Sequence, residues 1–122
     1  MRLSATGDEA TPLTAPVFQI LLSLADDDLH GYAIIRDVAA RTAGEVRLTA
    51  STLYGAIKRL LDAGWIEERP ARPRGAKDDP RRRYYRITRL GREAARAEAR
   101  RLERLAAMAR AKRLLPPLPK ES

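Results

Sequence analysis

The chain has 122 residues, enough for one small domain with a modest core. It contains no cysteine, which excludes a disulfide scaffold, a thiolate zinc site and a cysteine nucleophile. The net charge of +8 is uneven: residues 1–50 carry a net −3, residues 51–80 a net +1 and residues 81–122 a net +10. A basic second half favours a polyanionic partner.

A membrane is also a polyanion, but the sequence does not favour one. No apolar run approaches the ~18 residues that a membrane span needs, and the first thirteen residues lack the apolar core of a signal peptide. The basic half contains no Trp or Phe of the kind that anchors peripheral membrane helices. We therefore expect a cytoplasmic protein with no membrane partner.

The first predicted helix spans 12–25 and follows a small, polar tail, residues 1–11, which we expect to be disordered. Thr14 is its predicted N-cap. Apolar residues lie on two of its sides, so we expect one side to meet the domain's own core and the other a partner chain. Val17 and Leu21 are assigned to that dimer interface. Three carboxylates, 26–28, end the helix and predict a solvated turn rather than a cation site, since adjacent residues cannot all point at one ion.

A second helix is predicted from Leu29-His30-Gly31-Tyr32 to about Ala43, with Gly44 as its C-cap. His30 is the single histidine; with no Ser, Cys or second His at motif spacing, it predicts a turn residue near a helix start rather than a catalytic or metal-binding one. Residues 45–48 predict a short extended link. The predicted buried side of the helix comprises Tyr32, Ile34, Ile35, Val38, Ala39 and Thr42.

The stretch 48–61, LTASTLYGAIKRLL, predicts a helix with two different sides. One side is apolar, and Gly64 fits a left-handed stop after the helix. Thr49 or Ser51 can cap the start. A small polar N-terminal end followed by Lys58 fits the DNA major groove, where helix N-terminal residues reach base edges. The alternative is an ordinary surface helix with one buried stripe: Leu53, Ile57, Leu60 and Leu61.

Two strand-like runs, 65–69 and 83–87, flank a basic loop that contains proline and glycine, which predicts a β-hairpin with a projecting tip. Tyr84 and Tyr85 alternate along the second strand, so one should face inward, and Trp65 is expected in the core. Cations in this region can contact a DNA minor groove or phosphates; the alternative is a solvated loop. They are Arg72, Arg74, Lys77, Arg81, Arg82 and Arg83.

The last predicted helix begins after Thr88, its N-cap, and runs to about Leu115, where Pro116 and Pro117 stop it. At ~1.5 Å per residue it would span on the order of 40 Å, too long for so small a domain to cover its apolar stripe. Another helix is therefore expected to pack on it, and a second copy of the chain is the simplest source. The residues assigned to that dimer interface are Leu102, Leu105, Met108 and Ala109, together with the two from the first helix.

This order of elements predicts a mainly α protein with a small β-hairpin (α+β): a winged helix-turn-helix domain plus a C-terminal dimerisation helix. The predicted division is a tail over 1–11, a DNA-binding domain over 12–87, a dimerisation helix over 88–115 and a tail over 116–122.

Several short motifs, in order, resemble the PadR family of transcriptional regulators, and the matches cover about Pro12 to Leu105. The single short C-terminal helix is similar to the smaller PadR subgroup. The motifs are Pro12-Leu13-Thr14, Leu29-His30-Gly31-Tyr32, Ser51-Thr52-Leu53-Tyr54, Lys58-Arg59-Leu60, Gly64-Trp65-Ile66, Arg83-Tyr84-Tyr85-Arg86-Ile87-Thr88 and Gly91-Arg92.

The resemblance implies a cytoplasmic homodimeric repressor that binds inverted repeats on double-stranded DNA. It also implies, for many members, release by a small aromatic or drug-like effector, which in some stacks on a Trp of the C-terminal helix. Here Trp65 is the single Trp and residues 88–115 contain no aromatic residue, so a pocket of that stacked kind is not expected.

The candidate DNA-binding residues are Thr49, Ser51, Thr52, Tyr54, Lys58, Arg72, Arg74, Lys77 and Arg83. Most are expected to position the protein on phosphates rather than read bases. Two other interpretations stay open: a sequence-tolerant architectural nucleic-acid binder, and a helix-mediated module whose basic half binds an acidic protein. No nucleophile–base pair, phosphate-cradling loop or ligand set is present, so we predict no enzyme activity, no metal site and no cofactor.

Overall fold

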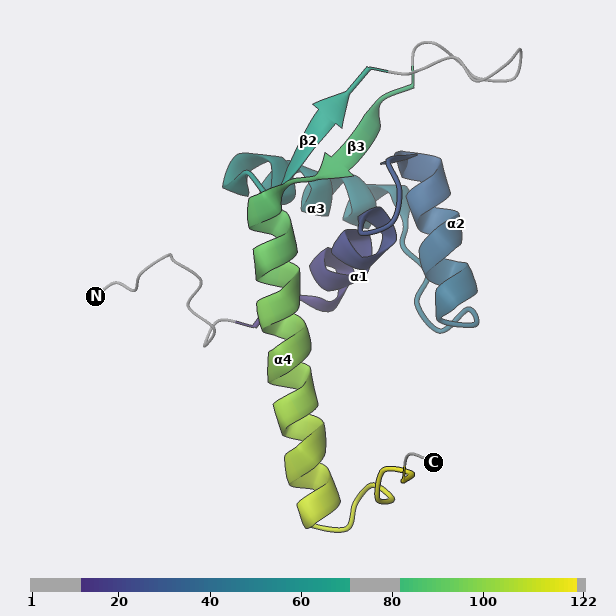
Figure 1. The fold of residues 1–122 in the computed structure, drawn as a ribbon. Helices are drawn as coiled ribbons and strands as arrows, with labels where there is room; N and C mark the ends of the chain where they lie inside the picture. The colour runs from purple at the N-terminus through teal and green to yellow at the C-terminus, as the bar shows by residue number, and fades with distance from the viewer. Residues whose placement is uncertain (1–11, 71–81, 121–122) are drawn as a thin grey trace.

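The structure is a computed structural model that describes residues 12–70 and 82–120. Its described part contains four helices and three short strands, and the long last helix extends away from a body in which the first helix lies among the others (Figure 1). This confirms the α+β, winged-helix prediction. The elements are α1 (Ala15–Leu24), β1 (Leu29–His30), α2 (Gly31–Arg41), α3 (Ala50–Ala63), β2 (Ile66–Arg69), β3 (Tyr84–Ile87) and α4 (Arg89–Ala111).

Three helices have a threonine N-cap. Thr14 and Thr88 are the predicted caps of α1 and α4, and of the two candidates for α3, Thr49 and Ser51, the structure has Thr49. The side-chain oxygens of Thr14, Thr49 and Thr88 each accept a hydrogen bond from a backbone N–H in the first turn of α1, α3 and α4. Each cap satisfies a donor that has no partner within its helix. The predicted stop of α3 is also confirmed, because Gly64 adopts a left-handed conformation with a φ of 77°.

The predicted hairpin is present as β2 and β3, and a third strand, β1, pairs with β3. The result is a three-stranded antiparallel sheet in the order β1-β3-β2. Leu29 and His30, which we expected to open the second helix, form β1 and pair with Tyr85 and Tyr84. The helix therefore begins at Gly31, and the Nδ1 atom of His30 caps it by accepting the Ala33 N–H at 3.2 Å. A strand of two residues has no periodicity, so the sequence pattern did not reveal it.

Two helix ends differ from their predicted positions. Thr42 rather than Gly44 caps α2, although Gly44 follows in a left-handed conformation and donates its N–H to Ala39 at 2.7 Å. The last helix ends at Ala111, before the predicted Leu115, because the chain turns through a left-handed Arg113 before it reaches the prolines.

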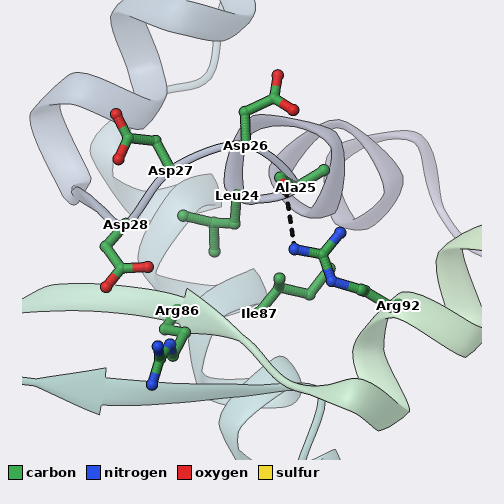
Figure 2. A pocket seen from close by; sticks show the side chains of 8 residues that line it. All are labelled: Leu24, Ala25, Asp26, Asp27, Asp28, Arg86, Ile87 and Arg92. Carbon is green, nitrogen blue, oxygen red and sulfur yellow. Dashed lines mark hydrogen bonds between the residues drawn. The ribbon is translucent and has the colours of Figure 1, made fainter.

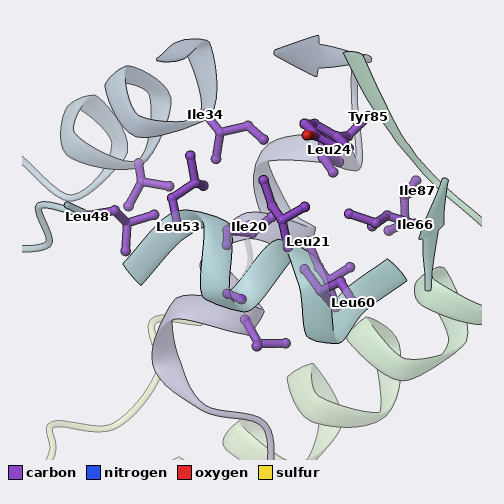
Figure 3. Packing of buried hydrophobic residues seen from close by; sticks show 14 residues of the cluster. Ile20, Leu21, Leu24, Ile34, Leu48, Leu53, Leu60, Ile66, Tyr85 and Ile87 are labelled. Atoms are coloured by element: carbon purple, nitrogen blue, oxygen red, sulfur yellow. The ribbon is translucent and has the colours of Figure 1, made fainter. Parts of the chain in front are cut away.

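The core forms around α1, which packs against α2, α3, α4 and β3 (Figure 3). Tyr85 is the inward-facing tyrosine of the predicted pair, and Trp65 packs against the core while partly buried. Each fully buried aliphatic side chain contributes about 1.5–3 kcal/mol of transfer free energy. The largest fully buried side chains are Ile20, Leu21, Leu24, Ile34, Leu53, Leu60 and Val38.

Three burial predictions are wrong. Val17 and Leu21, assigned to a dimer interface, are 7% and 0% exposed in the single chain, because α1 is already surrounded by the chain's own elements. A partner therefore has no access to them. Tyr32, expected on the buried side of its helix, is 61% exposed. It lies in the first turn of α2, where helical spacing alone does not decide which side faces the core.

Candidate nucleic-acid interface

Helix α3 has a buried back and an exposed front. Leu53, Ala56, Ile57 and Leu60 are buried on one side. Ser51, Thr52, Tyr54 and Lys58 are exposed on the remaining surface. The side chains of Ser51 and Lys58 lie on the same face as Gly55, since residues three or four apart are neighbours on a helix. An uncovered front with hydroxyls at its N-terminal end is the arrangement that major-groove readers use.

Thr49, a predicted DNA contact, is occupied by the structure of α3. Its hydroxyl oxygen accepts the Thr52 N–H at 3.1 Å, and the Thr49 and Thr52 hydroxyl oxygens are 3.1 Å apart. The Thr49 side chain is therefore already used to cap α3. Replacement of Thr49 would alter the start of α3 as well as any contact with a partner.

Lys58 forms an exposed ion pair along α3. Its Nζ atom lies 3.3 Å from a carboxylate oxygen of Asp62, and the two side chains are 77% and 68% exposed. An exposed pair of this kind contributes ~0.3–0.5 kcal/mol. The ammonium can therefore exchange Asp62 for another anion at little cost.

Tyr54 of this front contacts the start of α2 at Gly31, and two exposed residues of α2 were not assigned to the interface from the sequence. Tyr32 is exposed, and the guanidinium of Arg36 stacks over its ring at 4.8 Å from the centroid. The neighbouring Gly31 lies under the hydroxyl of Tyr54. A cation held on an exposed aromatic ring at a helix start suits contact with phosphate. The spacing of Tyr32 and Arg36, four residues apart at a helix start, is the signal that could have found them.

The hairpin strands carry cross-strand ion pairs on exposed side chains. Arg83, a predicted DNA contact, lies 2.9 Å from Glu68, and Arg86 lies 3.9 Å from Glu67. Arg82 approaches the Nε2 atom of His30 at 3.1 Å, which joins the base of the hairpin to the start of α2. The other predicted contacts in this region, Arg72, Arg74, Lys77 and Arg81, lie outside the described residues.

The second half of α4 exposes the apolar residues assigned to a dimer interface. Leu102, Leu105 and Met108 are 40%, 47% and 61% exposed, and Ala109 is partly buried. These side chains follow one another at helical spacing along one seam. The described part of a single chain does not cover the seam.

A pocket of about 270 Å³ lies between the turn after α1 and the junction of β3 with α4 (Figure 2). Asp26, Asp27 and Asp28 line one wall, and Arg86 and Arg92 line the other. Arg92 donates a hydrogen bond to the Ala25 carbonyl oxygen at 2.9 Å. Over residues 12–70 and 82–120, no group of three or more His, Cys, Asp or Glu residues is arranged to hold a metal ion. None of the helices described there is long and apolar enough to cross a membrane.

Residues 20–97 match the family model of the PadR-like transcriptional regulators, and this range covers more than half of the chain. The chain belongs to the PadR-like family of transcriptional regulators. PadR-like proteins regulate transcription and are not enzymes. An uncharacterized protein of Lysinibacillus sphaericus is 35% identical over 72 residues, a match that spans 59% of this chain and 63% of that protein.

Solved structures share the PadR-like fold. A transcriptional regulator from Clostridium thermocellum has a TM-score of 0.69 at 24% identity, covering 90% of this chain and 97% of that chain. A PadR family transcription regulator from Clostridium difficile R20291 has a TM-score of 0.68 at 21% identity, covering 80% and 97%. The PcaV transcriptional regulator from Streptomyces coelicolor, in complex with its natural ligand, has a TM-score of 0.64 at 23% identity, covering 82% and 62%. At these identities the likeness is one of fold.

Proposed function

We propose that this PadR-like protein is a homodimeric repressor that binds an inverted repeat on double-stranded DNA and inserts α3 into the major groove. The observation that carries the proposal is the division of α3 into a buried back and an exposed front with Ser51 and Thr52 near its start. Helix N-terminal residues reach base edges in this geometry.

The proposal gives different roles to different side chains. Ser51 and Thr52 are the candidates for contact with base edges, while Lys58 and Arg36 hold phosphates. Tyr54 is on the same front of α3, and its hydroxyl lies over Gly31 at the start of α2. Further phosphate contacts are proposed for Thr49, Arg83 and the wing cations Arg72, Arg74 and Lys77.

Dimerisation is proposed through the seam of α4. Leu102, Leu105 and Met108 are large apolar side chains that a single chain leaves exposed, and a second copy of α4 would remove them from water. Two α3 helices related by a two-fold axis would then face one side of the duplex, with half-sites roughly 10 bp apart, or a multiple of that.

A small aromatic or drug-like effector is the second part of the proposal. PcaV, which shares the fold, was solved with its natural ligand. Residues 88–115 of this chain contain no aromatic residue, so an effector would not be held by stacking on an aromatic ring of α4. Displacement of the protein from its operator by a panel of such compounds tests this part.

A mobility shift separates the proposed function from its alternatives. The probes are DNA from upstream of the protein's own gene and a scrambled duplex of equal length and composition. We expect tighter binding to the upstream DNA, with a footprint of two symmetric half-sites. Equal binding to both duplexes would indicate a sequence-tolerant architectural protein, and no binding to either would favour a protein-interaction module.

A further inference from the structure

Helix α4 is attached to the rest of the domain at its N-terminal end. The backbone N–H of Thr88 donates to the Trp65 carbonyl at 3.0 Å, and its hydroxyl donates to the Gly64 carbonyl at 2.7 Å. Gly91 lies so close to the Trp65 carbonyl that a Cβ atom there would overlap it. Because Gly64 and Trp65 directly follow α3, the first turn of α4 is fixed to the end of α3.

A second attachment lies two turns further along α4 and uses a buried carboxylate. Glu98 is 5% exposed, and its Oε1 atom accepts the backbone N–H of Leu13 at 3.2 Å. Arg101 holds the same carboxylate in a bidentate contact, with N–O distances of 3.0 and 2.6 Å. Glu98 and Leu13 are 85 residues apart in sequence, so this contact joins α4 to the chain immediately before α1.

The two attachments, together with the packing of α4 against α1 and β3, determine where α4 points. They are about 10 Å apart along the helix, and the helix continues beyond Glu98 by about 15 Å to Met108. A tilt of about 10° at the attachments would displace Met108 by about 3 Å, close to the ~3.4 Å separation of successive base pairs. The seam that we assign to dimerisation lies on this outer part: Leu102, Leu105 and Met108.

We propose that Glu98 is a positioning residue that sets the half-site spacing of the dimer by fixing the direction of α4 relative to α3. This inference rests on the proposed function, since it needs two copies joined through α4 and two half-sites on one duplex. Loss of the Leu13–Glu98 bond would leave the seam and the front of α3 intact but allow a wider range of angles between α4 and α3.

The experiment measures affinity for inverted repeats whose spacer is changed one base pair at a time. For Glu98→Ala we expect an intact dimer by sedimentation and unchanged affinity for an isolated half-site. The ratio of affinities between the best and the next-best spacer should fall by about threefold or more relative to wild type. A loss of folding stability alone would not reduce the preference for one spacer length over another, which we call the spacing profile.

A matched pair at residue 13 tests the bond from its other side. Leu13→Pro removes the backbone N–H and Leu13→Ala keeps it, while both remove the leucine side chain. We expect Leu13→Pro to flatten the spacing profile and Leu13→Ala to keep it. This pair also decides the question if Glu98→Ala does not fold.

The outcomes distinguish the inference from the function on which it rests. Wild-type protein without dimers or without a spacing preference would remove the proposed function and the inference together. A sharp wild-type profile that Glu98→Ala or Leu13→Pro leaves unchanged would overturn the inference alone. Equal flattening by Leu13→Pro and Leu13→Ala would also overturn it, because the leucine side chain would then be the cause.

Discussion

The hydroxyl of Tyr54 lies directly over Gly31, so close that a Cβ atom at residue 31 would lie 2.5 Å from the phenolic oxygen. The contact joins the second turn of α3 to the first turn of α2. Tyr54 is nevertheless 52% exposed, so its ring has room to move. Gly31 therefore controls where this exposed ring can lie.

Gly31→Ala should weaken DNA binding, and the accompanying decrease in the free energy of unfolding should be smaller than the loss of binding free energy. The added methyl group overlaps the Tyr54 hydroxyl, the end of a flexible side chain that can move aside, and it also lies 3.2 Å from the Cδ2 atom of buried Leu53, which needs to shift by only a few tenths of an ångström. The check is a comparison of the DNA affinities of wild type, Gly31→Ala, Tyr54→Ala and the double variant. In the Tyr54→Ala background, where the ring is absent, Gly31→Ala should have little further effect on DNA affinity. Additive losses would show that Gly31 acts without Tyr54.

Gly55→Ala should stabilise the protein and weaken its binding to DNA. Gly55 is in the interior of α3, where alanine is favoured by about 1 kcal/mol, and a methyl group there meets only the Arg59 guanidinium at 4.0 Å. The fold itself does not require glycine at position 55. A DNA duplex packed against the face that Gly55 shares with Ser51 and Lys58 would require it, because a methyl group there would occupy space that the duplex needs. Thermal unfolding and a DNA titration of the same variant check both halves, and unchanged or tighter DNA binding would contradict the second.

A salt series separates contacts with phosphates from contacts with base edges. Arg36→Ala and Lys58→Ala should each weaken operator and random DNA by similar factors and reduce the slope of log affinity against log salt by ~0.9. Ser51→Ala with Thr52→Ala should weaken operator binding more than random binding. Arg100→Ala, on the exposed surface of α4, is the control and should keep the parent's slope. A Lys58 variant with the parent's slope would remove that residue from the interface.

If the protein forms the dimer proposed above, Leu102→Asp combined with Leu105→Asp should convert it to a monomer. Burial of an unpaired carboxylate in an apolar seam is costly, whereas both positions are solvent-exposed in the single chain. Ala107→Asp adds a carboxylate to an exposed position of the same helix outside the seam and should leave the dimer intact. Sedimentation that finds the double variant still dimeric would place the interface elsewhere.

Glu98→Gln should remove part of the protein's sensitivity to acid. Hydrogen bonds from Arg101, opposed by burial and reinforced by the Leu13 N–H, lower the pKa of Glu98 from its ordinary value of 4.5. The stability that this adds is present above pH 4.5 and is lost as the pH falls through the lowered pKa. At pH 7 the variant should therefore be less stable by about 1–3 kcal/mol.

The check is urea unfolding of both proteins at a single concentration, near neutral pH and at about pH 3. The gap between wild type and Glu98→Gln should narrow in acid. Asp37 also has a lowered pKa: burial raises it, but hydrogen bonds from Arg41 and Ser23 lower it overall. Because Asp37 is present in both proteins, its contribution to the pH dependence cancels in the comparison. A gap that stays constant with pH would show that the Glu98 charge does not support the fold.

Features that depend on neighbouring residues were predictable from the sequence. Thr14, Thr49 and Thr88 precede apolar-periodic runs, and each one caps a helix; Gly64 ends α3 as expected. The buried back of α3 follows from helical spacing. These features need no information from elsewhere in the chain.

Features that depend on distant partners were not predictable. Glu98 reads as one more charge on an Arg-rich helix, and its burial depends on a backbone N–H 85 residues away. The strand Leu29–His30 exists because β3 pairs with it, and Val17 is buried because other elements surround α1. Among candidate site residues, the exposed front of α3 was predictable. The spacing of Tyr32 and Arg36 allows them to stack, but that the Tyr32 ring is exposed required the structure.

The connection between α3 and β2 consists of Gly64 and Trp65, whose N–H groups donate to the carbonyls of Leu61 and Leu60. At the other end of the sheet, β1 passes directly into α2. These short connections join the front of α3, the start of α2 and the described hairpin strands, and we expect the three to move as one unit. We expect the duplex to supply the adjustment when the two surfaces do not match. Operator sequences would then be ranked partly by how easily they bend, including at base pairs that no side chain touches.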